Sequence, residues 1–361
     1  MFKKISILFL SVSIFVGCNS SEEPEPTVTD NFDRQAMLTN ITDNIILPAY
    51  EDFSTKMNAL KSDGTTFAST PTLTNLENLR TSWLVAYKSW QHIEMFNLGK
   101  AEELEYSFYM NIYPLTVSDV ENNIATGSYD LNSSNNHDAQ GFPALDYLLF
   151  GVADSDTAIL AKYESTPNGN NYAKYLLDVL SQMNTLTEQV VLDFKSNRDS
   201  FVTSTANTAT SNVNKLINDY IFYYEKGLRA GKFGIPAGIF SSTPLPEKVE
   251  GYYSKIYSKD LALEALSAVK IIFKGDSNTT SFAQYLEALN RGDLASSIKN
   301  QFELANTQIN TLNVNFSEQV NTDNSAMLKS YDELQKAVIL LKLDMLQALN
   351  VSVDYRDSDG D

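Results

Sequence analysis

Cysteine is almost absent from this chain. Cys18 is the only one among 361 residues, so the protein cannot form an internal disulfide. Histidine is nearly as scarce, with only His92 and His137, and the sequence contains no HExxH pattern. A zinc site built on several histidines is therefore excluded. Positive charge is also in short supply, because 27 basic residues face 45 acidic ones for a net charge of −18. That balance argues against nucleic acid and anionic lipid as electrostatic partners, and simple solubility explains it adequately.

The N-terminus has the features of an export signal. Lys3 and Lys4 precede an apolar run over residues 5–16, which is shorter than the ~20 residues that a membrane-spanning helix needs. Small Gly17 and then Cys18 follow, an arrangement that resembles the bacterial lipoprotein processing site, although Phe15 stands where leucine is usual. We expect residues 1–17 to be a signal peptide and Cys18 to carry the lipid; an accidental or buried thiol is the alternative. Residues 18–30 are polar, acidic and proline-bearing, which predicts a tether.

The rest of the chain has helical patterning. Apolar residues recur at steps of three and four, for example between residues 325 and 350 and between residues 175 and 194, as on the buried face of a helix. We predict an all-α fold of two packed helical bundles, residues 31–200 and 201–361. Breaks are expected at residues 62–66, 126–140 and 165–171, where glycine, asparagine and serine gather. The segment over residues 196–211 either links the two bundles or belongs to a long helix.

The first candidate site lies on the predicted helix Trp83–Glu94. Trp83, Tyr87, Trp90 and Glu94 fall on one face of it, and His92 points away. The aromatic stripe by itself indicates core packing. A carboxylate at the end of an apolar face needs a hydrogen-bonded, ionic or metal partner, so Glu94 is a candidate site residue, with Trp90 beside it.

Three further segments have two interpretations each. Asp146 lies among the apolar residues 141–151. The preferred interpretation is an acidic side chain near the start of a helix, where the helix dipole favours it, and the alternative is a residue of a functional site. Arg229 opens the glycine- and proline-rich residues 229–238, which form either a pocket mouth or a turn. The acidic C-terminus, from Asp354 to Asp361, resembles half a calcium loop, although a frayed tail is preferred.

Together these pieces resemble the imelysin family, also called M75 peptidase-like, over most of residues 31–361. The likeness rests on residues 44–50, 83–94, 141–151, 234–238 and 359–361, in that order. It implies an all-α fold and envelope lipoproteins linked to iron uptake, some with peptidase activity. The family marker is G-x-H-x-x-E, with the histidine and glutamate as metal ligands. Here Gly141 begins the matching stretch, Pro143 replaces the histidine and Asp146 replaces the glutamate; Glu94 matches the acidic position after the aromatic helix.

This departure from the marker decides the predicted function. Without the histidine we expect no zinc hydrolase, and we predict a non-catalytic, membrane-anchored protein of the envelope associated with iron uptake. The resemblance suggests Glu94 and Asp146 as metal-binding residues, Trp90 and Arg229 as further ligand-binding residues, and iron or another divalent metal as the cofactor. We expect an outer-membrane location, facing the periplasm or the cell surface, and iron-uptake or other envelope proteins as partners. An M75-type metallopeptidase with an altered site and a helical scaffold for a membrane partner are the alternatives.

Overall fold

The structure, a computed structural model, describes residues 30–164, 167–275 and 280–354. These residues form helices and connecting loops and contain no strand, as the all-α prediction requires. The predicted signal, Cys18, the tether up to residue 29 and the acidic residues 355–361 lie outside the described part. The described residues from Phe32 onward belong to one compact unit.

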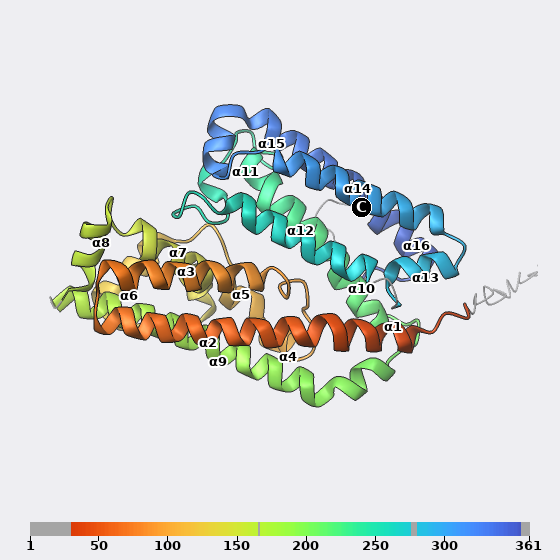
Figure 1. The fold of residues 1–361 in the computed structure, drawn as a ribbon, viewed down its shortest axis with the longest axis horizontal. Helices are drawn as coiled ribbons and strands as arrows, with labels where there is room; N and C mark the ends of the chain where they lie inside the picture. Colours follow the sequence, from red (N-terminus) through yellow and green to blue (C-terminus); the bar gives the residue numbers. More distant parts are fainter. Residues whose placement is uncertain (1–29, 165–166, 276–279, 355–361) are drawn as a thin grey trace, which may run out of the picture. The chain divides into compact units, whose positions relative to one another are not determined.

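The first half of this unit is built around three long helices (Figure 1). α2 packs against α3 and α9 along most of its length, and the short helices α4–α8 fill the remaining sides. The bounds here are α1 Arg34–Ile41, α2 Leu47–Ser69, α3 Leu73–Trp90, α4 Lys100–Glu103, α5 Tyr106–Met110, α6 Val117–Thr126, α7 Gly141–Asp146, α8 Asp156–Tyr163 and α9 Pro167–Thr203. The π-helical turns η1 Thr42–Ile46 and η3 Tyr147–Gly151 and the 3-10 helix η2 Ser134–Ala139 complete it.

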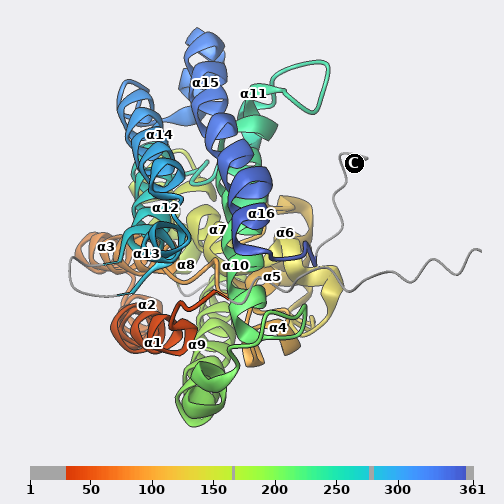
Figure 2. The same ribbon diagram turned by 90° about the vertical axis from the view of Figure 1, so that its right-hand side faces the viewer.

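The second half surrounds an unusually long π-helix, η4. η4 packs against α15, α10 and α12, and α14 lies against α12 and α15, as Figure 2 shows from the side. The bounds are α10 Asn212–Phe222, η4 Tyr223–Gly234, α11 Ile235–Ala237, η5 Pro246–Lys248, α12 Ser258–Lys274, α13 Phe282–Ala288, α14 Gly292–Asn310, α15 Phe316–Ile339, η6 Leu340–Met345 and α16 Leu346–Leu349. The division into two bundles at residue 200 stays a prediction.

The break predicted at residues 62–66 is wrong, because α2 continues through it to Ser69. Gly64 is buried and faces α9, where a β-carbon added to it would lie 2.2 Å from Cδ1 of Leu180. The glycine therefore permits a close approach of two helices and does not end one. Its cost in helix propensity, about 1 kcal/mol relative to alanine, is offset by packing along the α2–α9 contact.

The other predicted breaks fall close to the observed ones. Residues 127–140 connect α6 to α7 and include only the 3-10 turn η2. α9 begins at Pro167, inside the loop predicted over residues 165–171, and proline is well suited to the first turn of a helix. The segment over residues 196–211 serves both purposes, because α9 runs to Thr203 and residues 204–211 then lead to α10. Ser211 caps α10 by accepting a hydrogen bond from the Asn214 N–H at 3.4 Å.

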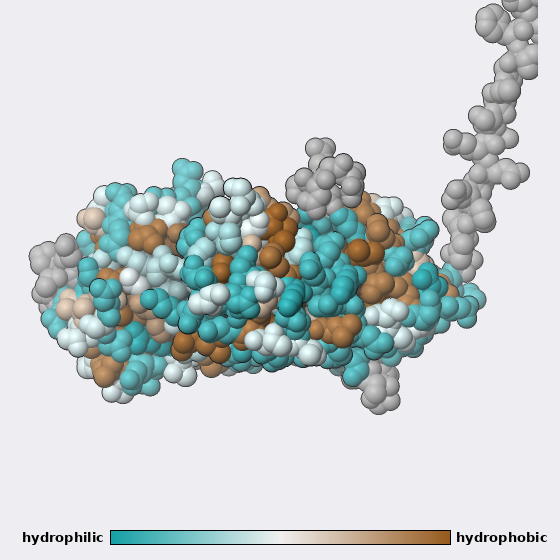
Figure 3. Space-filling model, turned by 90° about the horizontal axis from the view of Figure 1, so that it is seen from above, coloured by the Kyte–Doolittle hydropathy of each residue, from teal (hydrophilic) through white to brown (hydrophobic). Residues whose placement is uncertain are grey.

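Most of the apolar stripes are buried in a continuous core. On the face seen in Figure 3, the remaining hydrophobic residues form scattered patches between hydrophilic ones. Within the described residues, every helix is too short or too polar to cross a bilayer.

The α2–α9 contact generates a test. Gly64→Leu should lower the free energy of unfolding by about 2 kcal/mol, because the added side chain overpacks the contact with Leu180. Thr65→Leu, one residue along on the exposed side of α2, is the control and should leave stability within about 0.5 kcal/mol. Urea denaturation measures both. If Leu180→Ala restored no stability in the Gly64→Leu background, the proposed clash would be wrong.

Candidate functional site

The site begins where α3 ends. α3 stops at Trp90, and residues 91–95 continue as a tight turn in which the Glu94 N–H still donates to the Trp90 carbonyl at 2.9 Å. This turn points Gln91 toward Glu250 and Glu94 toward Tyr223, whereas His92 faces Glu264 on α12, 3.1 Å away. The predicted separation of His92 from the aromatic face is therefore observed.

The π-helix η4 supplies the opposite wall. Long π-helices are rare, and π-turns are frequent at functional sites. Tyr223 and Lys232, at the two ends of η4, both turn toward Glu94. Glu225 and Arg229, between them, turn toward α15 and η6. One helix therefore serves two separate buried polar clusters.

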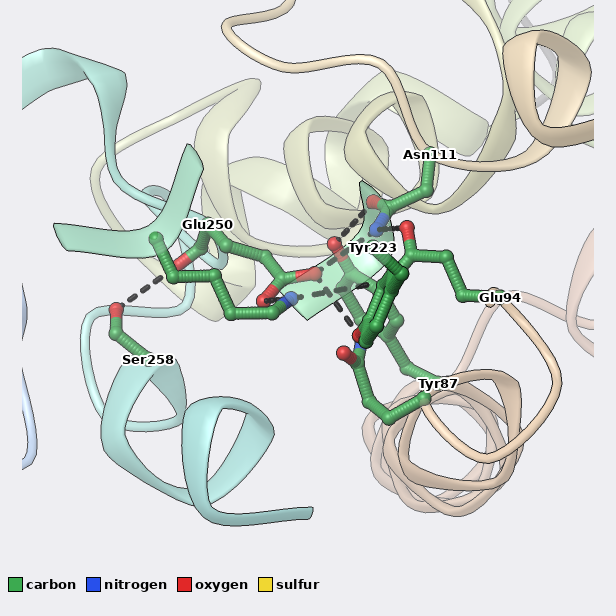
Figure 4. A network of polar contacts seen from close by, with 8 residues as sticks. Tyr87, Glu94, Asn111, Tyr223, Glu250 and Ser258 are labelled. Atoms are coloured by element: carbon green, nitrogen blue, oxygen red, sulfur yellow. Dashed lines mark hydrogen bonds and ion pairs between the residues drawn. The ribbon is translucent and has the colours of Figure 1, made fainter. Parts of the chain in front are cut away.

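The first cluster joins two glutamates through shared donors (Figure 4). Nζ of Lys232 lies 2.6 Å from Oε2 of Glu250 and 3.9 Å from Oε2 of Glu94. The amide of Asn111 donates to both carboxylates, at 2.8 Å to Glu94 and 2.9 Å to Glu250. Because only Lys232 is cationic, two carboxylates share one positive charge.

The remaining partners hold this cluster in place. Gln91 donates to Oε1 of Glu250 at 3.0 Å, and the Tyr223 hydroxyl donates to Oε2 of Glu94 at 3.1 Å. The Tyr87 hydroxyl donates to Oδ1 of Asn111 at 2.6 Å and fixes the orientation of that amide. Every carboxylate oxygen of the pair thus has a donor, as buried charges require.

Burial dominates the electrostatics of Glu94. Loss of water raises its pKa, Lys232 lowers it, and the negative charge of Glu250 raises it again, with a net upward shift. The indole N–H of Trp90 lies near enough to lower the pKa slightly but makes no hydrogen bond of ordinary geometry. The arrangement therefore favours a cation beside Glu94.

Asp146 lies next to this cluster rather than within it. It is only 2 % exposed, and its two oxygens accept the backbone N–H groups of Tyr253 (2.8 Å) and Ser254 (3.0 Å). Burial raises its pKa to about 7 and the charge of Glu250 adds to that shift, whereas the backbone donors oppose it. The predicted pair Glu94 and Asp146 is thus brought to the same region, where the charge of Glu250 acts on both carboxylates.

Trp90 and Arg229 occupy other positions. Trp90 is buried in the aromatic core against Phe53 and Tyr106, with ring centroids 5.6 and 5.3 Å away. Arg229 lies in the second cluster, where it donates to the Tyr331 hydroxyl at 2.5 Å and pairs with Glu225 at 3.5 Å. The structure therefore does not bring either side chain into contact with Asp146 or Glu250.

The carboxylates of Glu94, Glu250 and Asp146 do not fit a divalent metal ion as they are arranged. Lys232 stands where a cation between Glu94 and Glu250 would stand, and both oxygens of Asp146 accept backbone N–H groups. Within residues 30–164, 167–275 and 280–354, no group of three or more His, Cys, Asp or Glu side chains has the spacing to hold a metal ion. Binding a metal to Glu94 and Asp146 would require these contacts to break.

Sequence reasoning missed Asn111, Lys232 and Glu250. Lys232 had a signal, since it is the one charged residue in the apolar, glycine-rich residues 230–238, and a lone charge in such a run needs a buried partner. Glu250 lies in a turn with no periodicity, and Asn111 follows a short helix. Neither residue has a local pattern that separates it from solvent-exposed neighbours.

The fold and site together define an all-α protein with a buried acidic site between its helices. The imelysin family model, Peptidase M75, matches residues 46–341. The chain therefore belongs to the imelysin family, as its resemblance predicted.

Solved structures agree with this assignment at the level of the fold. An imelysin-like protein from Psychrobacter arcticum 273-4 superposes with a TM-score of 0.71 at 16% identity, covering 91% of this chain and 100% of its own. A protein described as an iron-regulated protein A precursor, from Parabacteroides distasonis, gives a TM-score of 0.68 at 18% identity, covering 86% and 94%. Iron-regulated protein A of Synechococcus elongatus is 26% identical over 125 residues, which is 33% of this chain and 34% of that protein. That match spans about a third of each chain.

The shared cation generates a test of the site. Lys232→Met should lower the free energy of unfolding by about 3 kcal/mol or more, because it leaves the buried carboxylate of Glu250 without its cationic partner. Adding Glu250→Gln should recover part of the loss, and urea denaturation measures both.

Lys336→Met is the matched control. Lys336 pairs with Glu333 at 2.7 Å on the surface, and losing such a pair costs at most about 1 kcal/mol. Equal effects of the two lysine substitutions would contradict the assigned importance of the buried pair.

Proposed function

We propose that this protein is a non-catalytic ligand-binding lipoprotein of the bacterial envelope, associated with iron uptake. The non-catalytic part of the proposal rests on the hydrogen bonds of Asp146. This residue stands at the acidic position of the family marker, yet both of its oxygens are engaged by backbone N–H groups. Pro143, at the histidine position, offers no side-chain ligand.

Metal-assisted hydrolysis would need more than this region offers. A catalytic zinc takes three protein ligands and an open position for water. The carboxylates near the marker are Glu94, Glu250 and Asp146, and their oxygens already accept hydrogen bonds. The arrangement therefore supports a binding role better than a peptidase role.

The association with iron uptake rests on relatives. Two of the similar proteins are named for iron regulation, and we extend that association to this chain as part of the proposal. The ligand would be an iron-containing or iron-related species that the site recognises without a catalytic metal.

The binding role is tested with the full chain extracted in detergent. Calorimetry against ferrous iron, haem and zinc should detect at least one specific ligand, and Glu94→Gln should weaken its binding about tenfold because a desolvated carboxylate is lost. Glu103→Gln, on the exposed helix α4, should leave it unchanged.

Two outcomes would overturn the proposal. Failure of every iron species and of haem to bind would remove the iron association. Cleavage of a broad peptide library that a chelator and Asp146→Ala both abolish would establish the alternative, a metallopeptidase with an altered site.

The anchoring part of the proposal rests on Cys18, Gly17 and the apolar run before them. Expression in a bacterium supplied with labelled palmitate should yield a labelled protein in the outer-membrane fraction, since several acyl chains anchor stably. Cys18→Ser should abolish the label and release the protein, whereas Ser20→Ala should leave both unchanged. A Cys18→Ser protein that stayed labelled would show that another residue carries the lipid.

A further inference from the structure

A small cavity lies beside the buried cluster. Its volume is about 130 Å³, and its walls include Tyr113, Tyr252, Tyr253, Asp146 and Glu247. No lysine or arginine lines it. The rest of the lining is apolar and includes Pro114, Leu115, Pro143 and Val249. Tyrosine rings and two acidic side chains on an otherwise apolar wall favour a positively charged ligand.

The charge around the cavity is unbalanced. The pKa of Tyr113 is raised by burial and by the charges of Glu250 and Glu94, so the field of the buried glutamates reaches the cavity wall. Lys232 is the one cation in contact with those glutamates among the described residues, and no ion pair of Asp146 occurs in the described part of the chain. A cation in the cavity would supply the missing positive charge.

The tyrosine rings are positioned in advance. Tyr252 and Tyr253 meet edge to face, with centroids 5.1 Å apart and planes at 81°, and the ring of Tyr147 also packs against Tyr253, with centroids 5.0 Å apart. A β-carbon on Gly151 would lie 2.4 Å from Cδ1 of Tyr253, so only glycine admits this ring. Asp146 fixes the backbone of the same residue. The conformational entropy that these tyrosine side chains would lose on ligand binding is therefore small.

We propose that this cavity binds a small organic ammonium ion, which adds a ligand class to the proposed binding function. Alkylated ammonium ions such as choline are weakly hydrated and are recognised by aromatic faces, and a nearby carboxylate adds to the attraction. A hard divalent ion instead needs six or more oxygen ligands or an octahedral shell, which this lining does not offer. The volume of about 130 Å³ is near that of a cavity of about 150 Å³ that admits benzene, so the trimethylammonium group is the part of choline that the cavity would hold.

Choline and its neutral isostere 3,3-dimethylbutan-1-ol provide a direct comparison. Calorimetry and saturation-transfer NMR with the full chain in detergent should find choline bound at least about tenfold more tightly, because the two ligands differ mainly in charge. Equal affinities, or no binding of choline and n-butylammonium, would overturn the proposal.

Substitutions locate the binding. Tyr252→Leu should weaken the binding of choline about tenfold, and Tyr252→Phe, which keeps the aromatic face, should weaken it less than about threefold. Tyr129→Leu, outside the cavity, is the control. Glu247→Gln, on the exposed rim, should weaken the binding of choline and leave the binding of the neutral alcohol unchanged. This variant still tests the proposal if Tyr252→Leu fails to fold. Choline binding that none of the cavity substitutions alters would place the ligand elsewhere and overturn it.

These outcomes differ from those that test the binding function. If iron species bind and choline does not, the ammonium assignment falls and the proposed function stands. If the chain cleaves peptides, the proposed function falls, and the comparison of choline with the alcohol still decides the ligand class of the cavity.

Discussion

The contact between Lys232 and Glu250 is the interaction on which the arrangement of the site depends. The two side chains are each 2 % exposed and come from a π-helix and from a turn eighteen residues further on. Removing both charges from water is costly, and the pair is tolerable only because other groups complete its hydrogen bonds. Asn111 and Gln91 do this for Glu250, so this carboxylate is one of the groups that tie the first half of the unit to the second.

The long π-helix explains how the fold contains two buried polar clusters a short distance apart. Its wider turn lets Lys232 face Glu250 while Arg229, three residues earlier, faces Tyr331. Each cluster has a glutamate with at least one basic partner. Because the same helix supplies residues to both, a shift of η4 would move residues of both clusters.

The sequence predicted the parts of this structure that depend on local pattern. The apolar stripes placed the long helices, and the isolated carboxylate of Glu94 marked one side of the site, because both signals are local. Gly64 was misread, since its effect depends on Leu180 of a distant helix. Glu250 and Asn111 were missed for the same reason: their burial results from chain segments that meet only in the folded protein.

The hydrogen bonds of Asp146 also set a limit on side-chain length at this position. Asp146 holds the residues that form the cavity wall, through the N–H groups of Tyr253 and Ser254. A glutamate here would place one more methylene between the backbone and the carboxylate, and it would push the wall outward or the carboxylate into the cavity. The shape of the cavity therefore depends on the length of a single acidic side chain.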